Sequence, residues 1–452
     1  MNEQLICEYK SFLNNGKTER ECVSQLISLA ESKGYQDISK FDSLKPGDKV
    51  YITKMNKTIA LFEIGKESIE KGLNILGAHL DSPRLDAKQN PLYEKDNITY
   101  LNTHYYGGIK KYQWTAIPLA IYGVVCKKDG STVKIVIGEN IDEPVFCISD
   151  ILPHLAQDQM KDKASDFIKG EDLDVLIGSS VPSKKSDSDK KEDKKDSKEK
   201  SKKIILELLK EIYGISEDDF ESAELEIVPA GKARDLGLDR SMILGYGQDD
   251  RSCAYASFAA MMDVKATKRT NWCLFVDKEE IGSVGATGMA SNLFENMIAE
   301  IVARTNKTYS ELSLRRCLEN SFMLSSDVNA AYDPLNPGLY DKENASILGG
   351  GVTFQKYTGS RGKSGASDAN PEFIAKIRAA MAKAKVSYQM AELGKVDQGG
   401  AGTIAYHAAK YGMDVLDAGI AVLSMHAPWE ITSKEDICQM FEAYKAFLKI
   451  EG

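Results

Sequence analysis

An apolar run that ends in two adjacent glutamates constrains this chain more than any other feature. Residues 272–276 read WCLFV, which predicts a strand buried inside the fold. Asp277 follows, and then Glu279 and Glu280 stand side by side ahead of a glycine-rich turn. Neighbouring residues at a strand end point in different directions, so one glutamate can bind a cation while the other faces a water molecule on that cation. Metal-assisted hydrolysis needs this division between a Lewis acid and a general base, although a solvated acidic loop accounts equally for the stretch taken alone.

A histidine and an aspartate follow a second short apolar run. Residues 73–76 predict a strand, which carries His79 and Asp81 at its carboxyl end. An imidazole that binds a metal usually has its other nitrogen held by a carboxylate, and active-site groups gather at strand carboxyl ends in open α/β sheets. The pair is therefore a candidate metal ligand with its supporting carboxylate. The alternative is a structural histidine capped by its neighbour.

Three further aspartates stand at comparable positions. Asp249 and Asp250 come just before a small, apolar helix predicted over 253–262, where an aspartate can also serve as a helix cap. Asp327 follows a strand predicted over 322–326. All three are therefore candidate carboxylate ligands.

A second histidine completes a ligand set. His426 follows a strand predicted over 415–422. Two histidines and three carboxylates suffice for two metal ions when one carboxylate bridges them, and two such ions can clamp a tetrahedral intermediate. Nitrogen and oxygen ligands without thiolate suit zinc, cobalt or manganese.

Composition limits the class of protein. The 452 residues, 42% of them hydrophobic, suffice for two domains or for one large domain with an insertion. A net charge of −9 argues against non-specific binding to nucleic acid, and there is no run of about 18 apolar residues to predict a transmembrane helix. The first residues lack the pattern of a signal peptide. The 8 cysteines form no CxxC pair and mostly lie in apolar patterns, which indicates reduced core cysteines and a cytoplasmic location.

The expected secondary structure changes in the middle of the chain. Residues 91–235 are β-rich, with strands expected over 124–137 and 144–151, whereas α/β alternation precedes and follows them. Within this part, residues 183–203 are drawn only from Ser, Lys, Asp and Glu, which predicts disorder. Mixed charges without aromatic residues favour a solvated insertion over a polyanion-binding arm, and an amphipathic helix is expected at 204–213.

The chain closely resembles the M18 metallopeptidases, the aspartyl aminopeptidase family, in five motifs that occur in the family's order: GAHLDSPRL, GYGQDDRSCAY, DKEEIGS, SSDVNAAYDP and SMHAPWE. The resemblance covers almost the whole chain. It implies an α/β fold, a zinc-peptidase three-layer α/β/α sandwich, in which residues 1–90 and 236–452 form the catalytic domain. Residues 91–235 are then an inserted β-rich domain with an oligomerisation or lid role, and the disordered charged loop 183–203 lies within it. The family also forms a tetrahedral dodecamer with the sites facing an internal chamber.

The resemblance implies a role for each matching residue. Glu279 matches the general base. Asp249 matches the aspartate that bridges two divalent ions, while one histidine and one further carboxylate match the ligands of each ion. The expected metal ligands are thus His79 and Asp327 on the first ion, His426 and Glu280 on the second, and Asp249 on both.

Three more residues match positions that support the site. Asp81 matches the carboxylate that supports His79, and Asp250 matches a partner beside the bridging aspartate, in the Asp-Arg form of a bacterial branch. His154, in ILPHLAQ, resembles a position that reaches into a neighbouring subunit's site, and a surface histidine is the alternative. Residues 104–114, HYYGGIKKYQW, match the family's corresponding segment only in part, so a preference for acidic N-terminal residues stays open.

These residues predict a metal-dependent aminopeptidase that releases N-terminal residues from short peptides, with two zinc ions per subunit and with cobalt or manganese as alternatives. In this mechanism Glu279 takes a proton from water and passes it to the leaving amine. A dipeptidase or deacylase on the same metal frame is an alternative. A cage-forming scaffold with a vestigial site is another, but it has no physical need for unpaired acids around a cavity. We expect a homo-oligomer with no nucleic-acid or membrane partner.

Overall fold

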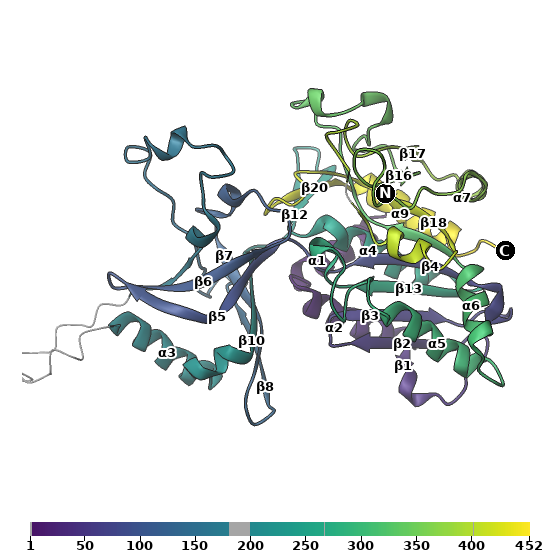
Figure 1. Ribbon diagram of the computed structural model, residues 1–452, viewed down its shortest axis with the longest axis horizontal. Coiled ribbons are helices and arrows are strands. Elements are labelled where there is room, and N and C mark those ends of the chain that lie inside the picture. Colours follow the sequence, from purple (N-terminus) through teal and green to yellow (C-terminus); the bar gives the residue numbers. More distant parts are fainter. Residues whose placement is uncertain (1, 180–198, 266, 401) are drawn as a thin grey trace, which may run out of the picture. The chain divides into compact units, whose positions relative to one another are not determined.

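Two compact units make up the chain in this computed structural model, which describes residues 2–179, 199–265, 267–400 and 402–452. One unit comprises the residues up to Ser82 together with Ala233–Gly452, and the other comprises Pro83–Lys232 (Figure 1). The boundary expected at residue 90 falls inside β5, Arg84–Lys95, which pairs along most of its length with β6, Ile98–Tyr106. The second unit therefore begins earlier than expected, and the functions assigned to the two domains remain predictions.

A nine-stranded mixed sheet runs through the first unit. The four strands in its middle, β13, β4, β14 and β18, are mutually parallel, and the strands that flank this group, β3 and β16, join it antiparallel. In sheet order, the strands are β1 Gln36–Asp37, β2 Lys49–Lys54, β3 Thr58–Glu63, β13 Thr270–Val276, β4 Leu73–His79, β14 Phe322–Ser326, β18 Asp414–Gly419, β16 Val352–Gln355 and β17 Tyr388–Met390.

The parallel strands bring their carboxyl ends to one edge of this sheet. His79, the last residue of β4, is opposite Val276, the last residue of β13. Ser326, the last residue of β14, is opposite Ala418 near the end of β18. The segments that follow these strands therefore start from the same edge, as the sequence predicted for the candidate ligands.

Helices of the first unit contribute to two separate apolar cores. The helix predicted over 253–262 lies within α4, and the amphipathic N-terminal part of the chain forms α1 and α2. Within the described ranges, no helix combines the length and the apolar character needed to cross a bilayer. One core receives side chains of α1 Glu3–Asn15, α2 Glu19–Ser32, α4 Gln248–Asp263, α7 Pro371–Ala384 and α9 Lys434–Phe447, and the other receives those of α5 Leu293–Thr305, α6 Glu311–Glu319 and α8 Ala405–Ala409.

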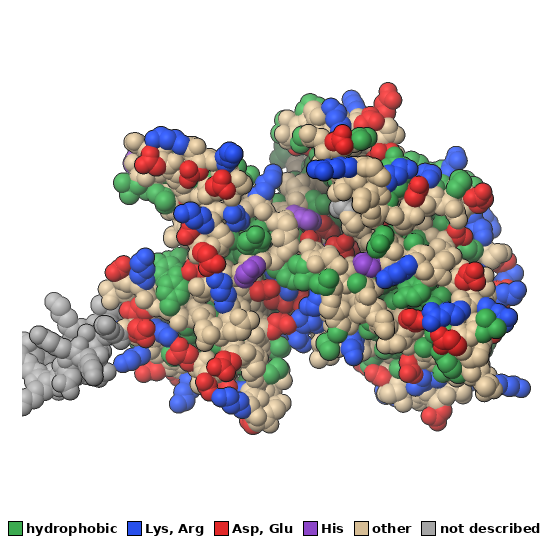
Figure 2. Space-filling model, in the orientation of Figure 1, with side chains coloured by type: hydrophobic (Ala, Val, Ile, Leu, Met, Phe, Trp, Pro, Cys, Tyr) green, Lys and Arg blue, Asp and Glu red, His purple; other side chains and the backbone are tan. Residues whose placement is uncertain are grey.

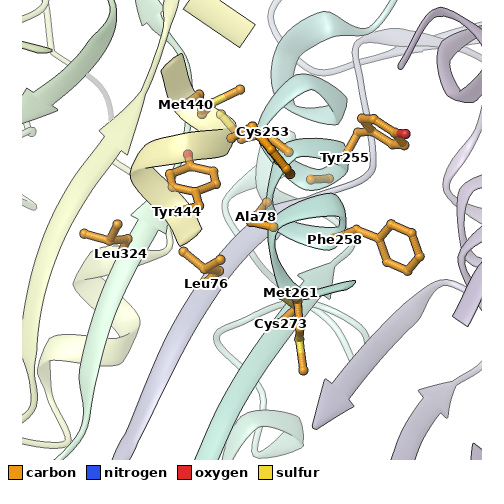
Figure 3. Close-up of a cluster of buried hydrophobic side chains, with 14 of the residues drawn as sticks. Leu76, Ala78, Cys253, Tyr255, Phe258, Met261, Cys273, Leu324, Met440 and Tyr444 are labelled. Carbon is orange, nitrogen blue, oxygen red and sulfur yellow. The ribbon is translucent and has the colours of Figure 1, made fainter. Parts of the chain in front are cut away.

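The two cores share the strands of the large sheet. In β4, Leu76 and Ala78 belong to one core while Leu73 and Ile75 belong to the other, because successive side chains of a strand point to opposite faces. Figure 3 shows Leu76 and Ala78 beside the apolar side chains of α4 and α9. A strand buried on both faces has no polar alternation, which explains the uninterrupted apolar run at 272–276.

A small five-stranded sheet completes the first unit and adjoins the expected site residues. The single strand predicted over 415–422 is wrong in one respect: β18 ends at Gly419, and the chain then enters a second sheet as β19. His426 consequently lies in the turn between β19 and β20. The strands are β11 Arg234–Leu236, β12 Met242–Gly245, β20 Glu430–Ser433, β19 Ala421–Leu423 and β15 Asn329–Ala330.

The second unit is built on a six-stranded antiparallel sheet. Its order is β8 Thr132–Ile137, β7 Leu119–Cys126, β10 Ala223–Pro229, β5, β6 and β9 Val175–Gly178. The strand expected over 144–151 is wrong, since Phe146 and Cys147 make only isolated bridges there. The apolar alternation misled because Val145 and Ile151 are exposed.

Most of the charged segment predicted over 183–203 lies outside the described residues, but its end does not. Helix α3 begins at Lys200 and runs to Tyr213, so disorder extending to 203 is wrong and the predicted helix starts four residues early. Tertiary contacts account for the difference: Ser201 is buried and accepts a 2.7 Å hydrogen bond from Thr99 Oγ1, and Lys202 Nζ pairs with Glu217 at 2.6 Å.

Candidate metal centre

His79 is positioned by the end of β4 and by Asp81. The side chain of His79 is buried, and its Nδ1 lies 2.9 Å from the carbonyl oxygen of Asp81 and 3.4 Å from Asp81 Oδ1. A proton on Nδ1 therefore has acceptors, which leaves the lone pair of Nε2 for another partner. Nε2 faces Asp249.

Asp249 lies between the two histidines. Its Oδ1 is 3.2 Å from His79 Nε2, and its Oδ2 is 3.2 Å from His426 Nε2. Asp249 and Asp250 have non-helical backbone angles at the start of α4, and Gly247 occupies the cap position of that helix. Both carboxylate oxygens of Asp249 face imidazole nitrogens, and the choice between a metal ligand and a helix cap remains a prediction.

The paired glutamates lie in a single helical turn that Asp81 holds. The backbone N–H groups of Glu279 and Glu280 donate to Asp81 Oδ1 and Oδ2, each at 3.2 Å. Glu279 Oε2 lies 3.9 Å from His79 Nε2, whereas Glu280 Oε2 lies 3.5 Å from His426 Nε2. The two glutamates thus face different histidines.

Asp327 and Asp250 lie in the same cluster. One donor atom from each of His79, Glu279 and Asp327 lies within 4.8 Å of the other two, and the same spacing holds for Asp249, Asp250 and Asp327. Asp250 Oδ2 also accepts a 3.4 Å hydrogen bond from His79 N. The structure therefore gathers in one place every residue that the sequence assigned to this site, while their individual roles remain predictions.

Burial makes the negative form of several of these acids unfavourable. It raises the pKa of Glu279 to about 7, against a smaller opposing effect of His79, and raises the pKa values of Glu280 and Asp327 well above their ordinary range. Burial acts in the same direction on Asp249, but hydrogen bonds from His426 and His79 outweigh it and hold its pKa low. A buried group of acids of this kind gains from an added positive charge.

The donor set fits a divalent metal ion. Imidazole nitrogens combined with carboxylate oxygens, without thiolate, are typical of zinc in hydrolases. Glu280 Oε1 is buried and has no hydrogen-bond partner among the described residues. Buried polar atoms are normally paired, so this oxygen is a natural ligand for a cation.

A cavity of about 820 Å³ opens beside the cluster. Its size is typical of small-molecule and peptide sites. One part of its wall consists of Asp249, Glu279, Glu280, Asp327 and His426. The remainder comes mainly from loop residues within 357–365, 392–400 and 402–403.

One buried residue of this region escaped the sequence analysis. Glu430 accepts hydrogen bonds from the backbone N–H groups of His426 and Asp249, at 2.8 and 3.1 Å. A glutamate four residues after the candidate histidine, within the motif SMHAPWE, was the available signal. His154 lies in the second unit, where it is exposed, and its contact with another subunit remains a prediction.

Comparison with known proteins identifies the family. The model of the family described as aminopeptidase I zinc metalloprotease (M18) matches residues 12–448. The chain belongs to the M18 family. A probable M18 family aminopeptidase 1 of Clostridium acetobutylicum is 57% identical over 444 residues, which cover 97% of this chain and 93% of that relative. This M18 chain is accordingly an aminopeptidase, a hydrolase of a zinc metalloprotease family.

Solved structures agree with this assignment. The crystal structure of an M18 aminopeptidase from Thermotoga maritima has a TM-score of 0.94 at 41% identity and covers 100% of this chain and 98% of that one. Aminopeptidase I of Clostridium acetobutylicum has a TM-score of 0.89 at 54% identity, covering 98% and 94%. A dodecamer from Saccharomyces cerevisiae, at 20% identity and a TM-score of 0.77 over 99% and 97%, shares the fold. The mixed α/β class predicted from the sequence is confirmed.

Proposed function

We propose that this M18 aminopeptidase releases N-terminal residues from short peptides at a two-metal site in which Glu279 is the general base. The observation that supports this proposal best is the position of Asp249. Each of its two carboxylate oxygens faces a different histidine at 3.2 Å, which is the arrangement a bridging ligand needs.

The proposed ligands divide between two ions. His79, Asp249 and Asp327 would hold the first, and Asp249, Glu280 and His426 would hold the second. When bound, two zinc ions supply Lewis-acid polarisation of the scissile carbonyl and acidify water, and cobalt or manganese can do the same. Asp81 fixes the tautomer of His79, and Asp250 holds the backbone of the same residue.

Glu279 moves the proton. Its carboxylate accepts a proton from the attacking water and donates it to the leaving amine. Burial raises the pKa of Glu279, which favours uptake of the proton. Asp81 orients Glu279 through the backbone, so the base keeps its side chain for the reaction.

Basic residues in the cavity wall support a preference for acidic N-terminal side chains. Arg361, Lys363 and Lys395 line the cavity, and Lys363 also lies 3.4 Å from Asp368. Replacing both Arg361 and Lys395 with Gln should lower the preference for an aspartyl over a leucyl substrate by roughly tenfold or more, since hydrogen bonds to charged groups contribute about 1.5–3 kcal/mol. Lys356→Gln, outside the cavity wall, is the matched control; an unchanged preference in the double variant contradicts this part of the proposal.

A closed homo-oligomer, a dodecamer in the proposal, is supported by the second unit. Leu152, Leu155 and Met160 belong to one segment and are 56%, 77% and 70% exposed, and apolar side chains that are exposed together often mark an interaction surface. His154 belongs to the same segment, which supports its contact with a neighbouring subunit. Mass measured in solution tests the assembly, and a fully active single subunit would contradict it.

Location and partners follow from the same surface and core. All eight cysteines are free, and four of them are buried, which supports a reducing compartment such as the cytoplasm. On the face drawn in Figure 2, basic and acidic side chains are interspersed and do not gather into a basic patch. This face therefore lacks the basic patch that is typical of nucleic-acid-binding proteins, as the proposal expects.

One experiment tests the activity and separates the alternatives. The purified protein is analysed for zinc and for its mass in solution, and it is assayed on dipeptides, on longer peptides and on a panel of aminoacyl chromogens with and without a blocked α-amine. The proposal predicts two zinc ions per subunit and turnover only with the free amine. Turnover of blocked substrates would indicate a deacylase, cleavage confined to dipeptides would indicate a dipeptidase, and bound subunits without turnover would indicate a scaffold.

A further inference from the structure

Glu430 joins the two chain segments that carry Asp249 and His426. Its Oε2 accepts a hydrogen bond from Asp249 N at 3.1 Å, and its Oε1 accepts one from His426 N at 2.8 Å. The residue is only 1% exposed. Both contacts are to main-chain groups, so Glu430 acts on the backbone from which the two candidate ligands project.

The side chain of Glu430 is itself held in place. Glu430 is the first residue of β20, and it lies opposite Gly245 of β12. Gln248 Nε2 donates to the carbonyl oxygen of Glu430 at 2.7 Å, while Gln248 Oε1 accepts from Tyr9 and Thr432 at 3.0 and 2.6 Å. The carboxylate therefore projects from a frame that ties the small sheet to the start of α4.

The backbone of the turn that carries His426 is strained, so it requires a stabilising interaction. Ser424 and His426 have φ values of 56° and 64°, in the left-handed region that residues other than glycine adopt only where their surroundings require it. Ala427 N donates to Ser424 O at 3.0 Å, which closes the turn, and Glu430 accepts the N–H of His426. Without that acceptor the strained backbone can relax, and the imidazole moves with it.

We propose that Glu430 is a positioning residue for the second metal ion, holding the main chains of Asp249 and His426 so that their side chains converge. This inference rests on the two-metal site proposed above. Two of the three ligands proposed for the second ion, Asp249 and His426, are on segments that Glu430 holds, whereas the first ion has only Asp249 among them. Loss of the two hydrogen bonds should therefore weaken the second ion more than the first.

The test uses the full-length Glu430→Gln variant and measures bound zinc per subunit over a series of metal-buffered free zinc concentrations. Glutamine preserves the size of the side chain and one acceptor oxygen, but its amide nitrogen cannot accept the second N–H. The wild type is expected to bind two zinc ions. In the variant, the affinity for one of them should fall by about 10–100-fold, as is usual for residues that orient ligands, while the other stays nearly unchanged.

Asp436 offers a matched control in the same unit. This buried carboxylate also accepts two backbone hydrogen bonds, from Gly351 N at 2.7 Å and Gly349 N at 2.8 Å. Asp436→Asn should lower the midpoint of thermal unfolding and leave both zinc affinities as in the wild type. The same selective loss of one zinc ion in this variant would mean that general destabilisation is the cause, and would overturn the inference.

Other outcomes are equally decisive. Unchanged zinc binding in Glu430→Gln, or parallel loss of both ions, overturns the positioning role. If Glu430→Gln does not fold, Glu430→Asp keeps the carboxylate but is too short to reach both N–H groups, and a smaller selective loss is expected; unchanged binding there overturns the role as well. A wild-type protein that binds fewer than two zinc ions overturns the proposed two-metal function itself.

Discussion

Asp81→Asn is the perturbation whose consequences the structure defines most closely. The carboxylate of Asp81 is fully buried and receives the backbone N–H groups of both Glu279 and Glu280 at 3.2 Å. Asparagine keeps the volume and one acceptor oxygen, but it turns an NH₂ donor toward the other N–H. One charge-assisted hydrogen bond is then lost and one donor is left unsatisfied, at about 1.5–3 and 1–3 kcal/mol respectively for groups of this kind. Because these two costs overlap, we expect the free energy of unfolding to fall by roughly 2–4 kcal/mol.

Asp81→Asn should lower the rate of catalysis because it displaces Glu279. A misplaced turn moves the base, and displacements on the order of 1 Å commonly lower rates by about 10²-fold. The assay is kcat on an aminoacyl chromogen, with zinc content and the thermal midpoint measured on the same samples. The decisive comparison is a double-mutant cycle with Glu279→Gln, since Asp81→Asn should cost far less once the base is already absent. Fully multiplicative losses, or an Asp81→Asn variant with wild-type kcat and midpoint, would refute the positioning argument.

Three further predictions concern the same unit. Glu279→Gln should keep wild-type zinc content and lower kcat by ~10²–10⁴-fold, and retention of more than about a tenth of the activity would remove Glu279 from the role of base. Asp249→Asn should lose both bound zinc and turnover because it removes charge beside both ions, and full zinc occupancy by elemental analysis would contradict the bridging role. Burial raises the pKa of Asp417 to about 6, so the folded protein holds this proton more tightly than the unfolded chain, and the stability contribution of Asp417 falls as the pH rises from about 4 to about 6. The free energy of unfolding of Asp417→Asn, relative to that of the wild type, should therefore rise by roughly 3 kcal/mol between pH 4 and pH 7, as measured from unfolding curves. A difference between the two proteins that does not vary with pH would contradict this prediction.

The residues of the candidate site could be located from the sequence because the ends of buried strands can be recognised in it. Apolar runs such as 272–276 mark buried strands, and polar residues directly after them must emerge at a sheet edge. His79 and Asp327 fall into place for this reason, since β4 and β14 are parallel neighbours. The family resemblance added the assignment of roles, which spacing alone leaves open.

Contacts between distant segments could not be predicted in the same way. Glu430 acts on the backbone N–H of Asp249, 181 residues away, and no side-chain pattern reports which backbone groups lack a partner. The early start of α3 depends on the bond between Ser201 and Thr99, which a purely polar composition conceals. The strand predicted over 144–151 was wrong because apolar residues of this segment, such as Val145 and Ile151, are exposed to solvent and do not pack in a core.

The two walls of the cavity differ in structure, and this difference affects how the substrate specificity of such an enzyme can change. One wall is made of the candidate site residues, four of which have backbone N–H groups that donate to buried carboxylates, whereas the other wall is made of loop segments within residues 357–365, 392–400 and 402–403. Loops accept substitution and insertion far more readily than strand ends do. Selectivity for one peptide over another can therefore drift, or be redesigned by grafting loops, while the hydrolytic machinery stays untouched. A fold of this kind can therefore change its substrate specificity while the residues of the candidate metal centre stay the same.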